Sequence, residues 1–310
     1  TALIIGAAGG HEIQAALHFG AGHVDAVELN PTTVELLRGR YAEFSGNIVD
    51  DPRVNYVQGD GRTFLARSDD SYDVIWFVAP DSYASNSAAT AGAFVLSESY
   101  LYTTEMIEKA FDHLTPEGVM VTQFGENEFD TRPIRTPRYL VTMRAAVADR
   151  VDDFSAHTGL VIESSEDFSL VRVSTIMLFR SPPDAATTLR VADAVRQVPT
   201  ARTVHFPGLP TEPSLSTDLI VGDAAEVAAL VDAYRFDISA VTDDRPFFWH
   251  FTSFTDVLSE FQRNYEDSEI AIGERLIVSL LIVAAVVAAI TLFVPFAISR
   301  RRGGELLVDD

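Results

Sequence analysis

Short apolar runs alternate with helix-like stretches over the first 125 residues of the chain. The runs read as strands, and the stretches between them have the apolar spacing of amphipathic helices. The predicted strands are Leu3–Ile5, His23–Leu29, Val54–Gln58, Tyr72–Val78 and Gly118–Phe124, and the predicted helices are Glu12–Phe19, Pro31–Phe44 and Thr103–Leu114. Strand–helix alternation with short connections indicates an α/β fold, with a mostly parallel sheet and helices on both faces.

The pattern loosens after residue 125. We expect helices at Pro137–Val151, 184–198, 223–234 and Phe254–Tyr265, and one strand or a pair at Leu170–Arg180. Ser181-Pro182-Pro183 is typical of a boundary. The predicted division is a domain over 1–181, an extension over 182–270, a membrane helix over 275–299 and a tail over 300–310. Because Thr1 leads directly into an apolar strand, we expect a piece of a longer chain.

The predicted membrane helix is the clearest physical signal. Leu276 to Ser299 is a run of 24 residues without a charge, between Arg275 and Arg300-Arg301-Arg302. At about 1.5 Å per residue, such a helix crosses a hydrocarbon core of about 30 Å. The alternative is a buried core helix, but core helices of this length usually keep a polar face.

Charge and composition exclude several classes of protein. The net charge of −22 argues against a nucleic-acid partner, because phosphate binding needs clustered Lys and Arg, and Lys109 is the only lysine. The acidity suits a cationic substrate, or reflects a salt-adapted host or codon usage. The absence of cysteine excludes disulfides, thiolate catalysis and Cys-ligated metal, and no other cluster has metal-ligand spacing.

A glycine-rich turn follows the first predicted strand, in Gly6-Ala7-Ala8-Gly9-Gly10. Glycine lets backbone approach a ligand, and the N-terminus of the following helix favours polar or anionic groups. The dinucleotide fingerprint G-x-G-x-x-G requires glycine where this chain has Ala8 and His11, so it fails at two of three positions. A purely structural turn explains the glycines equally well.

Acidic side chains end the next two predicted strands. Glu28, in Val27–Asn30, lies 18 residues after Gly10 and can accept both hydroxyls of a ribose; the alternative is a solvated strand-end acid. Asp60, in Gly59–Arg62, suits an adenine amino group; the alternative is an ordinary Asp-Gly turn. Because the carboxyl ends of parallel strands meet at one edge, the three motifs together predict a nucleoside site.

With Tyr72-Asp73-Val74-Ile75, these motifs resemble spermidine synthase-like proteins of the class I methyltransferase superfamily. The resemblance is closest to a branch of large bacterial membrane proteins with a synthase-like domain, and it covers roughly residues 1–255. Further segments similar to motifs of that branch are Ala89–Gly92, Leu96–Glu98, Leu101–Thr103 and Thr242–Phe248. The resemblance implies a Rossmann-like class I methyltransferase fold that binds S-adenosylmethionine or its decarboxylated form. It assigns cofactor contacts to Gly6, Ala8, Gly10, Glu28, Asp60 and Gly61.

The departure from the family lies after the fourth predicted strand. Spermidine synthases carry Asp-Ser-Ser-Asp there, and the first Asp acts as base on the attacking amine, whereas this chain has Val78-Ala79-Pro80-Asp81. A primary amine is mostly protonated near neutral pH and must lose a proton before it attacks carbon. Because Val78 cannot accept a proton, Asp81 is the predicted catalytic residue, with Tyr83, His11 and Glu98 as alternatives.

Thr242–Phe248 has a separate expectation. Asp243, Asp244 and Arg245 are expected to cap a helix and pair locally, while Phe247, Phe248 and Trp249 anchor at a membrane surface.

The sequence thus predicts a transferase that uses a sulfonium donor, passing a methyl or aminopropyl group to a small acceptor such as a polyamine-type cationic amine. A non-catalytic module that senses a nucleoside is the alternative, favoured by Val78; a transporter with a structural soluble domain is a third. The lipid bilayer is an expected partner through 275–299, nucleic acid is not, and homo-oligomer formation stays open. We expect a bacterial inner-membrane protein with this domain in the cytoplasm, although Arg300–Arg302 favour the opposite orientation.

Overall fold

The computed structural model describes residues 1–78, 98–126, 128–164, 172–259 and 272–305. The chain divides into two compact units, Thr1–Tyr83 with Glu98–Trp249 and Ala84–Ser97 with His250–Asp310. The predicted division at residue 182 stays a prediction.

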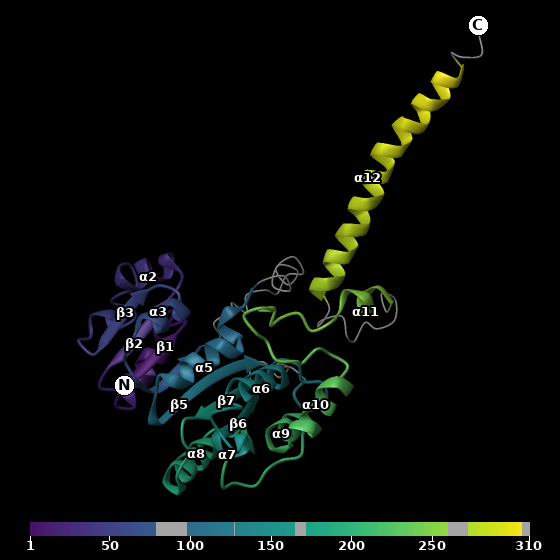
Figure 1. Ribbon diagram of the computed structural model, residues 1–310. Coiled ribbons are helices and arrows are strands. Elements are labelled where there is room, and N and C mark those ends of the chain that lie inside the picture. Colours follow the sequence, from purple (N-terminus) through teal and green to yellow (C-terminus); the bar gives the residue numbers. More distant parts are fainter. Residues whose placement is uncertain (79–97, 127, 165–171, 260–271, 306–310) are drawn as a thin grey trace. The chain divides into compact units, whose positions relative to one another are not determined.

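The first unit is built on an eight-stranded sheet in the order β3-β2-β1-β4-β5-β7-β6-β8 (Figure 1). Its strands are β1 Ala2–Ile5, β2 Val24–Glu28, β3 Val54–Gln58, β4 Tyr72–Phe77, β5 Leu114–Gly125, β6 Thr158–Ser164, β7 Arg172–Phe179 and β8 Ala201–His205. The first five strands pair in parallel, whereas β7 runs antiparallel to both β5 and β6. This order, reversing between β1 and β4, is Rossmann-like and confirms the predicted fold class.

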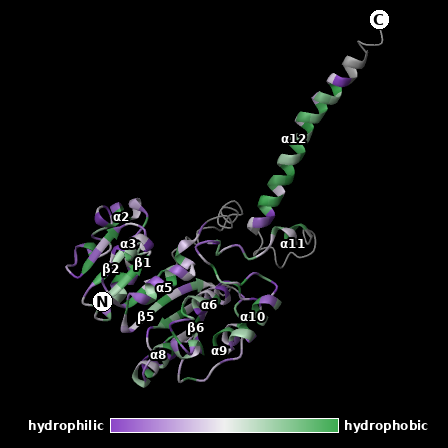
Figure 2. Ribbon diagram, viewed as in Figure 1, coloured by the Kyte–Doolittle hydropathy of each residue, from purple (hydrophilic) through white to green (hydrophobic). Residues whose placement is uncertain are grey.

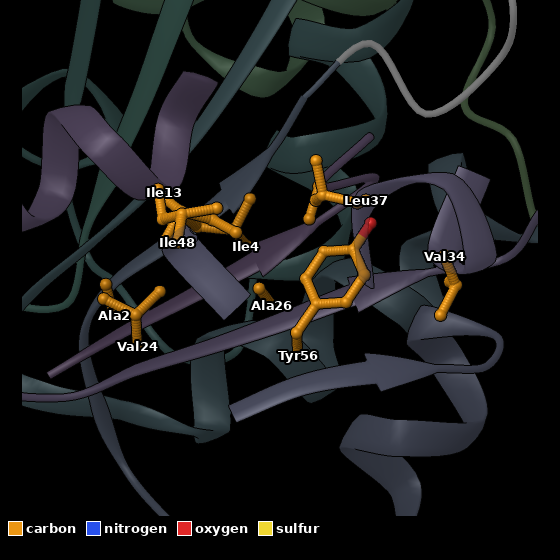
Figure 3. Close-up of a cluster of buried hydrophobic side chains, with 10 residues drawn as sticks. Ala2, Ile4, Ile13, Val24, Ala26, Val34, Leu37, Ile48 and Tyr56 are labelled. Atoms are coloured by element: carbon orange, nitrogen blue, oxygen red, sulfur yellow. The ribbon is translucent and has the colours of Figure 1, made fainter. Parts of the chain in front are cut away.

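Helices connect the strands and cover the sheet. Those of the first unit are α1 His11–His18, α2 Pro31–Arg38, α3 Gly61–Arg67, α5 Thr104–Asp112, α6 Arg135–Ala146, α7 Phe154–His157, α8 Ala185–Gln197, α9 Leu215–Val221 and α10 Ala224–Ala233, with 3₁₀ turns at Ile48–Asp50 and Tyr100–Tyr102. Ile13 of α1 and Val34 and Leu37 of α2 share a buried cluster with Ile4 of β1 and Tyr56 of β3 (Figure 3). This cluster fixes the first three strands beneath their connecting turns.

Most predicted elements of the first unit are present, and the differences have local causes. The predicted helix Pro31–Phe44 is wrong beyond Arg38, because Gly39 ends α2 and the chain turns as far as Asn47. Strand β6 is not predicted, since glycine is unfavourable inside a strand. In the structure, a Cβ on Gly159 would lie 2.8 Å from Phe206 Cδ2, so the close packing of Phe206 requires glycine there.

The second unit contains α11, Phe254–Ser259, and α12, Ile272–Glu305. Val257 and Val278 are buried together, with Phe254 packed against them. Within α12, the 28 residues Gly273–Arg300 are long and apolar enough to cross a membrane (Figure 2). The side chains from Leu280 to Arg300 are exposed, which is not the environment of a buried core helix.

Candidate functional site

The strand order places the candidate site at the carboxyl ends of the parallel strands. Neighbouring strands β1 and β4 are parallel, and their outgoing connections diverge because the strand order reverses between them. Ligands of open α/β sheets bind at such a switch point. The glycine-rich turn follows β1, Glu28 ends β2, Asp60 follows β3 and Val78 follows β4, so all four lie along this one edge.

The glycine-rich turn is held in a conformation that other residues rarely adopt. Gly6 and Gly10 both have φ of 85°, and Ala8 has φ of 37°. A positive φ costs little for glycine and more for alanine, so Ala8 needs support from its surroundings. The amides of Gly6 and Ala7 donate to the Val27 carbonyl oxygen at 2.9 and 3.1 Å, which ties the turn to β2.

Glu28 supplies the support for Ala8 from β2. Its Oε2 accepts the Ala8 amide at 2.8 Å, and its Oε1 accepts the Asn30 amide at 2.7 Å. The hydroxyl of Tyr56 donates to the Ala8 carbonyl oxygen at 2.8 Å, so both polar groups of this peptide unit are engaged. Burial raises the pKa of Tyr56 to about 12, so its hydroxyl stays a donor at neutral pH.

Glu28 is therefore a buried clamp and not a solvated acid at a strand end. A carboxylate has about four lone-pair sites, and the two amides use one on each oxygen. The hydrogen bonds to the turn leave lone-pair sites on both oxygens, and the binding of ribose hydroxyls by Glu28 stays a prediction.

Asp60 and Gly61 start α3 at the same edge. Asp60 is the N-cap, and its Oδ2 accepts the Thr63 amide at 2.7 Å. A Cβ on Gly61 would lie 2.4 Å from Ile5 Cγ2, so packing against β1 requires glycine here. The need for Gly61 is thus explained by packing, and a contact with cofactor stays a prediction.

The catalytic position predicted from the family pattern holds an apolar side chain. The Val78 amide donates to the Ile5 carbonyl oxygen at 3.0 Å, and its half-buried side chain packs on the cluster of Figure 3. The predicted catalytic residue Asp81 and its alternative Tyr83 lie outside the described residues, as do Ala89–Gly92.

The other two alternatives for the base are described. His11 is exposed at the start of α1, with its Nδ1 3.7 Å from Glu12 Oε1. Glu98 is exposed, and its hydrogen bond with the Tyr100 hydroxyl raises the pKa of that tyrosine. Both side chains remain open to a ligand from solvent. Among the described residues, no group of three acidic or histidine side chains is placed to hold a metal ion.

The structure overturns the expectation for Thr242–Phe248. Asp243 does not pair locally but binds Arg62 of α3, 181 residues earlier in the sequence, with Nη1–Oδ1 at 2.6 Å. Phe248 does not anchor at a membrane surface, because it is fully buried. It packs against Tyr102 and Phe124, with ring centroids 4.6 and 5.3 Å away. Aromatic composition alone does not distinguish a membrane anchor from a core residue.

A second buried carboxylate lies at this edge, and sequence reasoning did not identify it. Glu126 directly follows β5 and is 2% exposed. It accepts the Thr136 amide at 2.8 Å, and its Oε1 lies 3.9 Å from Arg135 Nη1. Burial raises the pKa of Glu126, while Arg135 and the backbone amides oppose that change. Its position next to a strand end was the available signal, as for Glu28.

Comparisons with known proteins agree with this architecture. Residues 1–148 match the family described as the spermine/spermidine synthase domain. The polyamine aminopropyltransferase of Korarchaeum cryptofilum is 28% identical over 120 residues, which are 39% of this chain and 34% of that protein. The polyamine aminopropyltransferase of Pyrobaculum calidifontis is 31% identical over 129 residues, 40% of this chain and 41% of that protein. The matched part of the chain therefore spans only about a third to two fifths of the length of these relatives.

Among solved structures, a probable spermidine synthase from Corynebacterium glutamicum aligns over 78% of this chain and 71% of its own. That alignment has 15% identity and a TM-score of 0.47. The strand order and the switch-point edge define a Rossmann-like fold of the class I methyltransferase type. Residues 1–148 are similar to the spermine/spermidine synthase domain, which confirms the resemblance seen in the sequence.

Proposed function

We propose that this chain is a transferase that moves an aminopropyl group from an adenosyl sulfonium donor to an amine, in polyamine-related chemistry. One observation carries the proposal: Glu28 holds the glycine-rich turn at the switch-point edge, in a segment that matches the spermine/spermidine synthase domain. Glu28 accepts the ribose hydroxyls, Asp60 accepts the adenine amino group, and the turn from Gly6 to Gly10 passes close to the ligand.

The reaction is a displacement at carbon. The donor supplies a carbon bound to a positively charged sulfur, and that bond breaks as the new carbon–nitrogen bond forms. The chain's contribution is to align the two reactants and to remove a proton from the acceptor nitrogen. Val78 cannot take this proton, and we assign it to Asp81, three residues further along the chain. Decarboxylated S-adenosylmethionine is the donor that aminopropyl transfer requires, whereas S-adenosylmethionine would supply a methyl group.

The place of the reaction is part of the proposal. The helix over 275–299 anchors the chain in a bacterial inner membrane, and the synthase-like domain lies in the cytoplasm, where adenosyl donors are made. A cationic acceptor suits the net charge of −22. The Arg300-Arg301-Arg302 run opposes this orientation, so labelling the accessible side of the membrane tests it.

The test is a calorimetric titration of the detergent-solubilised chain with S-adenosylmethionine and with its decarboxylated form, followed by product analysis with a diamine acceptor. We expect binding that is lost in Glu28→Ala and in Asp60→Ala, and kept in Glu35→Ala, which changes an exposed acid of α2. Asp81→Asn should keep binding and lose turnover.

Other results lead to different conclusions. Donor binding without turnover in the unchanged chain would support a nucleoside-sensing module. If neither donor binds to the folded chain, the proposed function is wrong.

A further inference from the structure

Asp60 and Arg62 are close enough in sequence to pair with each other. The chain contains a second example of the same spacing, Asp51-Pro52-Arg53, and there the pair closes on itself. Arg53 Nε donates to Asp51 Oδ1 at 2.9 Å, and its Nη2 donates to Oδ2 at 2.7 Å. In an Asp-x-Arg segment, the arginine can therefore donate to both carboxylate oxygens of the aspartate when no other acid competes for it.

Arg62 is turned away from Asp60 toward a competing acid. Its Nη1 donates to Asp243 Oδ1 at 2.6 Å, and its Nη2 pairs with Oδ2 of the same carboxylate. Two parallel hydrogen bonds between a guanidinium and a carboxylate are among the stronger polar contacts in proteins. Asp60 still acts on Arg62, since its charge contributes to raising the pKa of that arginine, after the larger effect of Asp243.

Asp243 is itself held in place by α5 and its N-cap. Its Oδ1 accepts the Thr103 hydroxyl at 2.7 Å, and its backbone amide donates to Glu105 Oε2 at 2.9 Å. These two contacts hold the Asp243 carboxylate in place without Arg62. Arg62 Nη1 also donates to the Tyr100 carbonyl oxygen at 3.2 Å and to Thr103 Oγ1 at 3.3 Å, so Asp243 is its charged acceptor within a wider set of contacts.

The Asp60 carboxylate is left with an oxygen that can accept a hydrogen bond from a ligand. Among the described residues, the Asp60 side chain accepts one hydrogen bond, from the Thr63 amide to Oδ2. Its Oδ1 belongs to a residue between β3 and α3, at the carboxyl edge of the sheet. An arginine closing on Asp60, as Arg53 closes on Asp51, would occupy that oxygen.

We propose that Asp243 is a positioning residue that keeps Arg62 off Asp60, so that Asp60 stays available to the amino group of the donor's nucleoside base. This inference rests on the proposed function, in which Asp60 binds that amino group. It gives a role to the Thr242–Phe248 motif and accounts for an ion pair between segments 181 residues apart.

The test compares donor binding by the solubilised full chain and three variants, with decarboxylated S-adenosylmethionine and S-adenosylmethionine as probes. In Asp243→Asn, Arg62 moves onto Asp60, and the dissociation constant rises about tenfold, the usual effect of losing one good hydrogen bond. In the double variant Asp243→Asn with Arg62→Gln, no guanidinium remains to intrude, and the affinity returns toward that of the unchanged chain.

The third variant, Asp112→Asn, is the control for loss of an ion pair. Asp112 Oδ2 lies 3.2 Å from Arg150 Nη2 in the same unit, so this change removes a comparable contact, and donor affinity should not change. A merely structural role for Asp243 predicts instead that the double variant binds no better than Asp243→Asn, and that result would overturn the proposal.

A crystal structure of Asp243→Asn separates this inference from the proposed function, because it needs no donor. If Arg62 is hydrogen-bonded to Asp60 in that structure, the inference that Asp243 keeps Arg62 away from Asp60 is supported even when neither donor binds. In that case only the proposed function is wrong. Arg62 remaining in its present position, or unchanged donor affinity in Asp243→Asn, would refute the inference.

Discussion

At the scale of single residues, the candidate site depends on one alanine in a conformation that alanine rarely adopts. The amide of Ala8 is bound by Glu28 and its carbonyl oxygen by Tyr56. We predict that Glu28→Gln lowers the free energy of unfolding by about 1–3 kcal/mol, because the new amide group turns a donor toward the Ala8 or Asn30 amide. Urea denaturation measures this change, and donor binding should fall with it.

The matched control is Glu35→Gln. Glu35 is an exposed acid on α2, so the same change of charge and shape there should leave stability within about 0.5 kcal/mol. Equal changes in the free energy of unfolding for the two substitutions would contradict the role of Glu28 in holding the turn.

Two glycines on either side of Asp60 should respond differently to a methyl group. Gly61→Ala forces a Cβ to 2.4 Å from Ile5 Cγ2, and we expect a loss of about 1–3 kcal/mol from overpacking. Gly59→Ala meets nothing within 4 Å and should be nearly neutral. Thermal unfolding of the two variants distinguishes them. If Gly61→Ala is as stable as Gly59→Ala, packing does not account for the glycine.

At the scale of elements, Asp243 joins the start of α3 to the start of α5. The hydrogen bonds from Arg62 lower the pKa of Asp243, outweighing the opposing effect of burial. A carboxyl group whose pKa is lower in the folded state than in the unfolded chain stabilises the fold at pH values above its ordinary pKa of about 3.9. This stabilisation is lost as the pH falls through the lowered pKa. We therefore predict that Asp243→Asn costs less stability at about pH 3 than at about pH 6.

Denaturation at both pH values, with Asp244→Asn beside it, tests this prediction. Asp244 is the exposed neighbour of Asp243, and it controls for the general effect of removing one negative charge from an acidic chain. A loss for Asp243→Asn that does not depend on pH would show that the ion pair contributes little.

At the scale of the whole molecule, α12 contains a segment that is long and apolar enough to cross a membrane. The exposed side chains of this segment are mostly apolar on all sides of the helix. Val283 and Val287 are both more than half exposed. An arginine near the centre of a spanning helix costs about 2.5–3.5 kcal/mol of insertion free energy. We predict that Val283→Arg with Val287→Arg moves the chain out of carbonate-washed membranes, where the unchanged chain is retained.

Two arginines elsewhere provide the control for this experiment. Ala228→Arg with Ala229→Arg adds the same charge to exposed positions of α10 and should leave the chain in the membrane. An unchanged chain that fractionates with soluble proteins would contradict the membrane helix.

Much of the fold could be predicted from the sequence because its signals are local. The apolar runs of β1 to β4, the glycines around Ala8 and the acids at the ends of β2 and β3 report on their own elements. Parallel pairing then follows from strand–helix alternation, and it brings Glu28 and Asp60 to one edge. The roles of these residues toward a donor, and of Asp81 as a base, stay predictions.

By itself, the sequence determined strands β1 to β5, the glycine-rich turn at the edge of the sheet and the helix that is apolar enough to span a membrane. Only the tertiary structure decided that Phe248 is a core residue and that Asp243 binds Arg62. The physical reason is that periodicity and residue type tell whether a side chain prefers burial or a charged partner. They do not tell which of many distant segments supplies that environment, since packing selects it when the whole chain folds.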